Sequence, residues 1–263
     1  MKRIAWLTDV HLNFLRPAAR EAFFESLPEA DAFVITGDIG EAHDVCDHLR
    51  AFAARGPTYF VLGNHDFYKG SIDGVRADVR ELCRDVPGLR WMPDAGVVPL
   101  TDSTCLVGHD GWGDGRLGDY TNSPVELNDW RLIGEFDWLG RRDRLAKLRA
   151  LGDEAAGHFR AVLPDALARF EHVVVLTHVP PFREACWHEG KLSDDDWLPH
   201  FSCKAVGDAL REAMIAAPGR RMTVLCGHTH GVGEADILPN LRVLTGGVVY
   251  GKPAVQRVIE VDA

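Results

Sequence analysis

The sequence predicts an α/β fold in which short buried strands alternate with helices. Five apolar runs, rich in Val, Ile, Leu and aromatic residues, have the length expected of buried strands. These runs are Ile4–Leu7, Ala32–Ile35, Tyr59–Leu62, Val173–Leu176 and Thr223–Leu225. Segments with helical potential separate them, for example Pro17–Ser26 and Ala42–Ala54. Alternation of strands and helices along one chain predicts an α/β sheet.

The size and composition of the chain are those of an ordinary globular protein. Its 263 residues, 46% hydrophobic and 26% charged, suit one large α/β domain or two small domains, and we predict a single domain over residues 1–263. The net charge of −10 argues against non-specific binding to duplex nucleic acid. It does not argue against a small anionic substrate, because a bound cation can reverse the field locally.

The cysteines and the N-terminal run bear on the cellular location. None of the six cysteines forms a C-x-x-C pair, which favours reduced, mostly buried thiols. Asp9 interrupts the N-terminal apolar run too early for a signal peptide. We find no stretch of about 18 apolar residues that would indicate a membrane span. The sequence therefore predicts a cytoplasmic protein without a membrane partner.

The middle of the chain predicts a helical insertion at about residues 109–171. His109–Asp119 has the glycine and aspartate content of a loop. Ser123–Glu126 has the form of a capping box, with Ser123 as N-cap. The pattern is then mostly helical as far as Phe170. Breaks are expected near Gly134, Gly140, Gly152 and Pro164.

The last part of the chain returns to strands. These strands are expected at Val232–Leu238, Leu241–Leu244 and Val255–Val261. The Pro239-Asn240 pair predicts a hairpin turn between the first two.

Polar side chains follow each of the five buried runs, where α/β sheets bind their ligands. Asp9 and His11 have i, i+2 spacing, which places both on one face at a strand end. The full candidate set is Asp9, His11, Asp38, Asn64, His178, His228 and His230. Two carboxylates, one amide and four imidazoles exceed the needs of one ion. They suit two divalent ions that share a bridging carboxylate.

This pattern resembles the calcineurin-like metallophosphoesterases. The signature of that family is D-x-H, G-D, G-N-H-[D/E], a lone H and G-H-x-H. The chain has Asp9-Val10-His11, Gly37-Asp38, Gly63-Asn64-His65-Asp66, His178 and Gly227-His228-Thr229-His230, in that order. Each fragment has an ordinary alternative: a turn or helix N-cap for Asp38, and a loop histidine for His178. Five such coincidences in the right order are improbable, so we predict a metal site.

The resemblance implies a four-layer αββα sandwich with a dinuclear site at one edge. The first metal would take Asp9, His11 and His230. The second metal would take Asn64, His178 and His228, and Asp38 would bridge the two. His65 would be the proton donor, with Asp66 orienting its imidazole, and Asn64 and His65 would also contact the substrate. Mixed imidazole and carboxylate ligands admit Mn, Fe, Zn or Co.

Other residues have weaker claims to the site. Arg116 is a candidate for binding a substrate phosphate, with a solvated loop arginine as an equal alternative. A helix-face position is favoured for His43, and burial under the insertion is favoured for Trp112. A turn role is favoured for His109 and Asp110.

The function that follows is metal-dependent hydrolysis of a small phosphomonoester or phosphodiester, and nucleotide-like substrates fit this class. A hydroxide bridging the two metals would attack phosphorus, and a histidine would protonate the leaving oxygen. The serine/threonine protein phosphatases carry an arginine where this chain has Leu62, and a glutamate where it has Asp66. Those departures disfavour a protein phosphatase. A non-catalytic scaffold for a partner protein is the other alternative, although relatives of that kind typically lose ligands and this chain keeps the full set.

Overall fold

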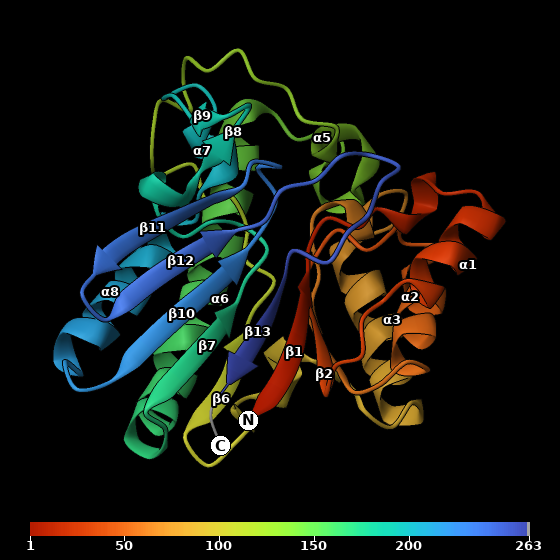
Figure 1. Cartoon of the computed structure of the whole chain (residues 1–263). Helices are drawn as coiled ribbons and strands as arrows, with labels where there is room; N and C mark the ends of the chain where they lie inside the picture. Colours follow the sequence, from red (N-terminus) through yellow and green to blue (C-terminus); the bar gives the residue numbers. More distant parts are fainter. Residues whose placement is uncertain (262–263) are drawn as a thin grey trace.

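The computed structural model describes residues 1–261, and it contains two sheets stacked face to face (Figure 1). The first sheet has the order β13-β1-β2-β3-β4. Its strands are β1 (Lys2–Leu7), β2 (Ala32–Thr36), β3 (Thr58–Val61), β4 (Leu89–Trp91) and β13 (Arg257–Val261). The first four strands are parallel, and β13 is antiparallel to β1. The sequence did not indicate β4, which has only three residues.

The second sheet has the order β11-β12-β10-β7-β6-β5. Its strands are β5 (Val98–Pro99), β6 (Thr104–Gly108), β7 (His172–Leu176), β10 (Arg221–Cys226), β11 (Gly233–Leu238) and β12 (Leu241–Thr245). The four central strands are parallel, and the edge strands β5 and β11 are antiparallel to their neighbours. The hairpin predicted at Pro239-Asn240 joins β11 to β12. A separate small ribbon pairs β8 (Trp187–His188) with β9 (Lys191–Leu192).

Helices cover the outer face of each sheet, which confirms the four-layer αββα sandwich (Figure 1). The first sheet is covered by α1 (Pro17–Glu25), α2 (Val45–Ala53) and α3 (Ile72–Asp85). The second sheet is covered by α6 (Arg141–Arg169) and α8 (Lys204–Ala216). The short helical elements are η1 (Leu12–Phe14), η2 (His65–Phe67), α4 (Met92–Ala95), α5 (Asp129–Leu132), η3 (Gly134–Phe136), η4 (Arg183–Ala185) and α7 (Leu198–Phe201). Within the described residues, no helix has the length and apolarity needed to cross a membrane.

The strands are apolar on both faces because each face is covered. In β7, Val173 and Val175 pack with the helices of the second sheet. The alternate residues, Val174 and Leu176, pack between the two sheets. This alternation follows from the two-residue period of a strand. It explains why the sequence shows a continuous apolar run at this strand rather than an alternating one.

The expected breaks near Gly152 and Pro164 are wrong, because α6 runs through both for 29 residues. Packing against β6, β7 and α8 carries the helix past them. A Cβ at Gly152 would lie 2.7 Å from the Cβ of Asp114, so the glycine permits a close approach rather than ending the helix. The second half of the predicted insertion is therefore a layer helix, the crossover between the parallel strands β6 and β7. Of the predicted insertion, only residues 109–140 lie outside the layers.

The capping box expected at Ser123 is also wrong, since no helix begins there and α5 begins at Asp129. The Ser123 hydroxyl instead donates to the Asp196 carbonyl (2.8 Å) and accepts the Val125 N–H (3.1 Å). Tertiary contact between two loops has replaced the local cap. The single domain predicted for residues 1–263 includes residues 262–263, which lie outside the described part.

We expect the layer between the sheets to contribute strongly to stability. Leu106 is fully buried there, so Leu106→Ala should lower the free energy of unfolding by about 2–5 kcal/mol. Ile215 on α8 is 64% exposed, and Ile215→Ala should change it by less than about 0.5 kcal/mol. Urea unfolding followed by circular dichroism measures both. Equal losses in the two variants would contradict this account of the core.

Candidate metal centre

All seven predicted ligands come together where the carboxyl ends of the two sheets meet. Asp9 and His11 follow β1, Asp38 follows β2, Asn64 follows β3, His178 follows β7, and His228 and His230 follow β10. Backbone hydrogen bonds join these turns across the strands. The Asp9 N–H donates to the Gly37 carbonyl, and the Gly227 N–H donates to the His178 carbonyl. The turns therefore form one connected surface.

Five of these ligands have a left-handed backbone. The φ angles are 49° for Asp9, 41° for His11, 54° for Asp38, 68° for His228 and 61° for His230. Residues other than glycine rarely adopt this backbone region, and each instance costs of order 1–3 kcal/mol. The sharp turns that result bring both members of each i, i+2 pair to the same site.

The glycines before two of the ligands leave room for the neighbouring ligand. A Cβ at Gly227 would overlap the Asp9 carboxylate and the Thr8 hydroxyl. A Cβ at Gly63 would overlap the Asp38 carboxylate and would lie 2.7 Å from the His178 ring. The glycines of the G-N-H and G-H-x-H fragments therefore allow the ligand carboxylates to pack against the backbone of these turns.

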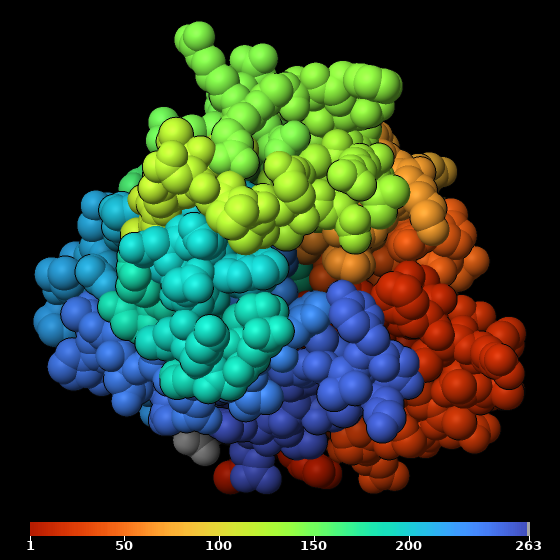
Figure 2. Space-filling view, turned by 90° about the horizontal axis from the view of Figure 1, so that it is seen from above, coloured from red at the N-terminus to blue at the C-terminus, as the bar shows by residue number. Residues whose placement is uncertain are grey.

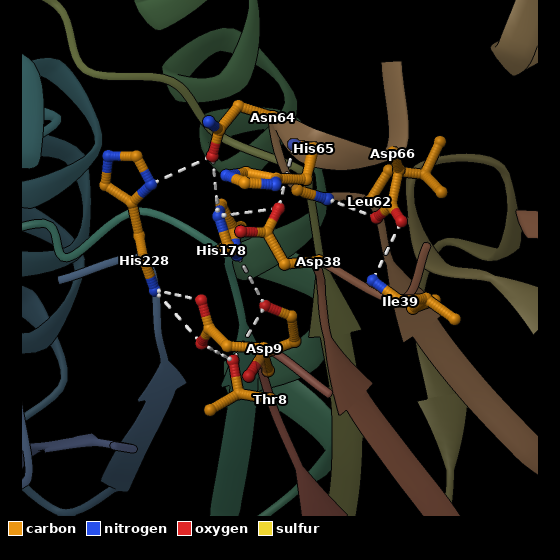
Figure 3. Close-up of polar contacts among 12 residues, drawn as sticks. Thr8, Asp9, Asp38, Ile39, Leu62, Asn64, His65, Asp66, His178 and His228 are labelled. Carbon is orange, nitrogen blue, oxygen red and sulfur yellow. Dashed lines mark hydrogen bonds and ion pairs between the residues drawn. The ribbon is translucent and has the colours of Figure 1, made fainter. Parts of the chain in front are cut away.

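The Asp38 carboxylate lies between two groups of ligands. Figure 3 shows it next to His178, which belongs to the second group. Its Oδ2 is 3.6 Å from His11 Nε2, and its Oδ1 is 3.4 Å from His178 Nε2. On the first side, Asp9 Oδ1 is 3.4 Å from His230 Nε2. The ligand atoms of Asp9, His11, Asp38 and His230 all lie within 4.8 Å of one another.

On the second side, one amide oxygen meets two imidazoles. Asn64 Oδ1 lies 3.1 Å from His178 Nε2 and 3.0 Å from His228 Nδ1 (Figure 3). Each ring also has a backbone carbonyl at its other nitrogen: His178 Nδ1 lies 2.8 Å from the Thr36 carbonyl, and His228 Nε2 lies 3.1 Å from the His200 carbonyl. Metal-binding histidines commonly donate their outer N–H to such a carbonyl. With a cation bound, these outer N–H groups would hold the rings in place and leave the nitrogens beside Asn64 to bind the cation.

The centre has the electrostatics of a cation site. Burial, with the nearby Asp9 charge, raises the pKa of Asp38 well above its usual range. Burial, reinforced by neighbouring imidazoles, lowers the pKa of His11 to about 2 and that of His228 well below its usual value. Burial alone would raise the pKa of Asp9, but its hydrogen bond and charge interactions with His230 lower it instead. Burial beside Asp9 therefore disfavours the anionic form of Asp38, which a bound cation would restore, while the His11 and His228 rings stay neutral.

An unpaired imidazole indicates what is needed to complete the centre. Both ring nitrogens of His11 are buried and have no hydrogen-bond partner, which is costly without a ligand. A divalent cation shared with Asp9 and Asp38 would satisfy Nε2 and offset the two carboxylates. The donor set therefore fits the metals implied by the sequence. The assignment of each residue to one of two ions remains a proposal.

His65 lies at the edge of the centre, as expected of a residue that meets the substrate. Its ring stacks on Tyr68 with 4.2 Å between centroids, and its edge faces His11 at 4.6 Å. Its backbone N–H donates to the Asp38 carboxylate (2.9 Å). The ring lines the cleft beside the ligands. Its role as proton donor stays a prediction.

Asp66 does not orient the His65 ring, which corrects the role implied by the resemblance. Its buried carboxylate accepts the backbone N–H groups of Ile39, Gly40 and Gly63, each at 2.8 Å (Figure 3). Residues 65 and 66 are adjacent in the short helix η2, so their side chains point in different directions. Asp66 instead ties the loop after β2 to the loop after β3. Its role is to position Asp38 and Asn64.

Arg116 is not brought to the centre. Its guanidinium pairs with Asp114 (3.0 Å) and Asp153 (2.8 Å), which holds the glycine-rich loop against α6. It is not among the residues that line the cleft. The interpretation as a phosphate-binding residue therefore lacks support, and a structural ion pair explains the position.

The other weak candidates also have structural roles. His43 lies in the turn before α2, with its side chain 65% exposed, rather than on a helix face. Trp112 is buried against Phe67 and Phe136, as expected. Asp110 is fully buried, and its carboxylate accepts the Leu62 N–H (2.8 Å) and the Trp91 indole N–H (2.9 Å). It thereby supports the strand end that carries Asn64.

Sequence reasoning missed Asp129 and Tyr68. The buried Asp129 carboxylate accepts from Asn64 Nδ2 (2.9 Å) and from the Tyr68 hydroxyl (2.7 Å). With its amide nitrogen held there, Asn64 must present its oxygen to His178 and His228. Asp129 comes from the 109–140 segment, 65 residues from Asn64. No motif marked it, and only the folded arrangement reveals the contact.

A cleft of about 200 Å³ opens from the metal centre to solvent. In the view from above, four parts of the chain surround this hollow (Figure 2). They are the loop after β3, the 109–140 segment, the loop and ribbon near residues 188–201, and the stretch from His228 to Tyr250. A substrate that enters the cleft meets His65 and the ligands together.

A four-layer α/β sandwich with this ligand set defines a metallophosphoesterase class of protein. The family model described as calcineurin-like phosphoesterase matches residues 2–232, so the chain belongs to that family. The enzyme class predicted from the sequence, a phosphoric ester hydrolase with two divalent metals, is that of this family. The resemblance inferred from the five fragments is thereby confirmed.

Curated relatives match part of the chain. It is 34% identical over 120 residues to a UDP-2,3-diacylglucosamine hydrolase of Xanthomonas axonopodis, and 32% identical over 120 residues to that of Stenotrophomonas maltophilia. Each match covers 40% of this chain and 44% of the relative. The chain thus spans less than half the length of these relatives.

Solved structures match the fold over nearly the whole chain. A phosphopantetheinyl hydrolase from Mycobacterium tuberculosis has a TM-score of 0.69 at 17% identity, covering 98% of this chain and 96% of that one. A dimetal phosphatase from Danio rerio has a TM-score of 0.55 at 16% identity, covering 94% of this chain and 87% of that one. At these identities the likeness establishes the fold alone.

The glycine before His228 should be essential for metal binding. Gly227→Ala places a methyl group against Asp9 and Thr8, so we expect Mn²⁺ affinity to fall about tenfold or more. Gly219→Ala is the matched control, because nothing lies within 4 Å of a Cβ there. Isothermal titration calorimetry with Mn²⁺ measures both variants. Unchanged affinity in Gly227→Ala would refute this packing argument.

Asp129 should control the second group of ligands. In Asp129→Ala the Asn64 amide can rotate, and we expect the second equivalent of Mn²⁺ to bind about tenfold more weakly. Asp137→Ala, an exposed aspartate in the same segment, is the control. Calorimetric titration separates the two equivalents. Loss of the first equivalent alone would show that Asp129 acts elsewhere.

Proposed function

We propose that the chain hydrolyses small phosphate esters at the centre formed by its seven ligands, with His65 beside the scissile bond. The observation that carries this proposal is the meeting of two ligand groups on either side of Asp38. The first group would hold one cation through Asp9, His11 and His230. The second group would hold another through Asn64, His178 and His228. Mn, Fe, Zn and Co all suit such ligands.

Two bound divalent cations supply Lewis acidity toward the phosphoryl oxygens and lower the pKa of a bound water. The chain itself contributes orientation. Asp38 is held by the His65 N–H, and Asn64 is held by Asp129. These contacts fix both ligands before a substrate arrives, which is the condition for electrostatic preorganisation.

His65 would donate a proton or a hydrogen bond to the leaving oxygen. Burial and the nearby His230 and His178 rings lower the pKa of His65 to about 3, so the free protein holds the neutral ring near pH 7. A neutral imidazole retains one N–H donor. An anionic substrate beside the ring would raise its pKa again, because opposite charges favour the protonated form.

The nature of the relatives supports a small phosphorylated substrate. A UDP-2,3-diacylglucosamine hydrolase carries a nucleotide in its named substrate, and it matches 40% of this chain. A nucleotide-like ester therefore stays a candidate.

The six cysteines are free, which fits the cytoplasmic location that the sequence predicted.

The non-catalytic scaffold is the second candidate. A scaffold has no need of paired imidazoles around buried carboxylates, whereas here both histidines of the second group have a backbone carbonyl at the ring nitrogen away from Asn64. The protein phosphatase is disfavoured by Leu62 and Asp66, and Asp66 is engaged in tying two loops together. The hydrolase is therefore the function that the site supports best.

The bridging ligand and the donor should both be required for turnover. With Mn²⁺ added, Asp38→Asn and His65→Ala should each lower kcat on p-nitrophenyl esters by about 100-fold or more. Asp137→Asn, at an exposed position, should retain the parent rate. Unchanged turnover in both Asp38→Asn and His65→Ala would overturn the mechanism. No bound metal and no turnover with any of the four metals would favour the scaffold.

A further inference from the structure

The walls of the cleft differ in chemical character. One wall consists of His188, Trp197 and Phe201. Facing the ligands from another side is Tyr250, whose ring lies 4.7 Å from that of His11 and 5.1 Å from that of His230. The floor contains four of the ligands, Asp38, Asn64, His228 and His230, together with His65. Because these walls reach directly to the centre, they contact whatever is attached to the reacting phosphorus.

The aromatic wall is continuous with the metal centre. The ring of the ligand His228 lies 5.3 Å from that of Phe201, which stacks on Trp197 at 4.9 Å. Trp197 in turn lies 5.0 Å from His188. Phe201 is buried, whereas Trp197 and His188 are half-buried and present ring surface to the cleft. Such a row accepts a flat or apolar group in stacked or edge-on contact.

The cleft has no cationic side chain of its own. Among the described residues that line it, there is neither a lysine nor an arginine. The charged groups on its third side are instead the carboxylates of Glu126 and Asp129.

The nearest basic residues have other partners or positions. Arg141 donates to backbone carbonyls of residues 120–123, and Arg144 lies over the Trp130 ring beside Glu126. Lys252 lines a separate hollow on the other side of His230. Apart from a histidine that the substrate itself causes to be protonated, such as His65, the positive charge that meets a phosphate in the cleft must come from bound metal.

This charge pattern discriminates between phosphate esters. A phosphomonoester carries nearly two negative charges near neutral pH, whereas a diester carries one. Two divalent ions offset by Asp9 and Asp38 leave about two positive charges, and the buried Asp129 carboxylate reduces that surplus. Glu126 is itself paired with Arg144 and adds little to this reduction. A second charge on the substrate would lie near carboxylates without an arginine or lysine to pair with it. A monoanion is better matched.

We propose that the natural substrate is a monoanionic phosphodiester, one ester arm of which carries a flat or apolar group that packs on Trp197. This inference deepens the proposed function and rests on it. The walls on two sides of the centre leave room for both arms of a diester, and the absence of a basic side chain removes the usual means of holding a terminal phosphate.

The test compares two esters with the same leaving group. The Mn²⁺-loaded protein is assayed with bis(p-nitrophenyl) phosphate and with p-nitrophenyl phosphate, both of which release nitrophenolate. We expect kcat/KM to be about tenfold or more higher for the diester. A preference for the monoester overturns this inference while the hydrolase function stands. No hydrolysis of either ester with Mn, Fe, Zn or Co counts against the proposed function itself.

A substitution at Trp197 tests the proposed contact between the aromatic wall and the substrate. In Trp197→Ala, KM for the diester should rise about tenfold while kcat is retained, and Trp197→Phe should restore most of the loss. The control is Trp138→Ala, since Trp138 is 95% exposed and does not line the cleft. An equal effect of Trp197→Ala and Trp138→Ala on KM, or no effect of Trp197→Ala, refutes the role of the wall.

A charge variant tests the electrostatic argument independently. Asn128 is exposed and lines the cleft, so Asn128→Lys adds the missing cation. It should shift the ratio of diester to monoester kcat/KM toward the monoester by about tenfold. Asn122→Lys adds the same charge to the same segment outside the lining and should leave the ratio unchanged. An unchanged ratio in Asn128→Lys contradicts the charge argument.

Discussion

The turns at the ends of β1, β2 and β10 have to place two carboxylates and three imidazoles in one small volume. Left-handed backbone at Asp9, His11, Asp38, His228 and His230 is the geometry that achieves this. Its cost has to be offset by the surroundings. The two stacked sheets supply rigid strand ends, and the loops are tied to one another by the Asp66 carboxylate and by backbone pairs such as Asp9 to Gly37.

The ligands are also held from outside the layers. Asn64 is a neutral ligand, and its amide oxygen and amide nitrogen differ mainly in whether they accept or donate hydrogen bonds. Which of the two atoms faces the metal centre therefore depends on the group that holds the nitrogen. Asp129 does so from the 109–140 segment, which otherwise shields the cleft. The same carboxylate that orients Asn64 also places negative charge in the cleft. Assembly of the centre and selection among phosphate esters therefore depend on one residue.

The sequence predicted most of the sheet strands, and it picked out side chains that the fold does bring together, for physical reasons. Val173–Leu176 is apolar on both faces because helices cover one and a second sheet the other, and this makes a strong signal. His228 and His230 stand out by spacing alone. The strands that escaped notice, such as β4, are too short to show a pattern.

The errors arose where distant contacts override local preference. Gly152 and Pro164 are typical of helix breaks, yet α6 continues through both because it packs against the second sheet and α8. Ser123 looks like an N-cap, but its hydroxyl bonds to residue 196. Asp66 and Asp129 are ordinary carboxylates in the sequence. Their roles depend on which backbone or amide groups the fold places beside them, and no local pattern carries that information.

The Asp9 carboxylate accepts the backbone N–H of His228, which lies 219 residues further along the chain. During synthesis the ligands of the first sheet leave the ribosome long before the partners that complete them. Until β10 is in place, two aspartates and an unpaired histidine are open to water, and such a partial set can hold an ion only weakly. Capture of the cation should therefore coincide with docking of the second sheet, so that metal uptake reports completion of the fold.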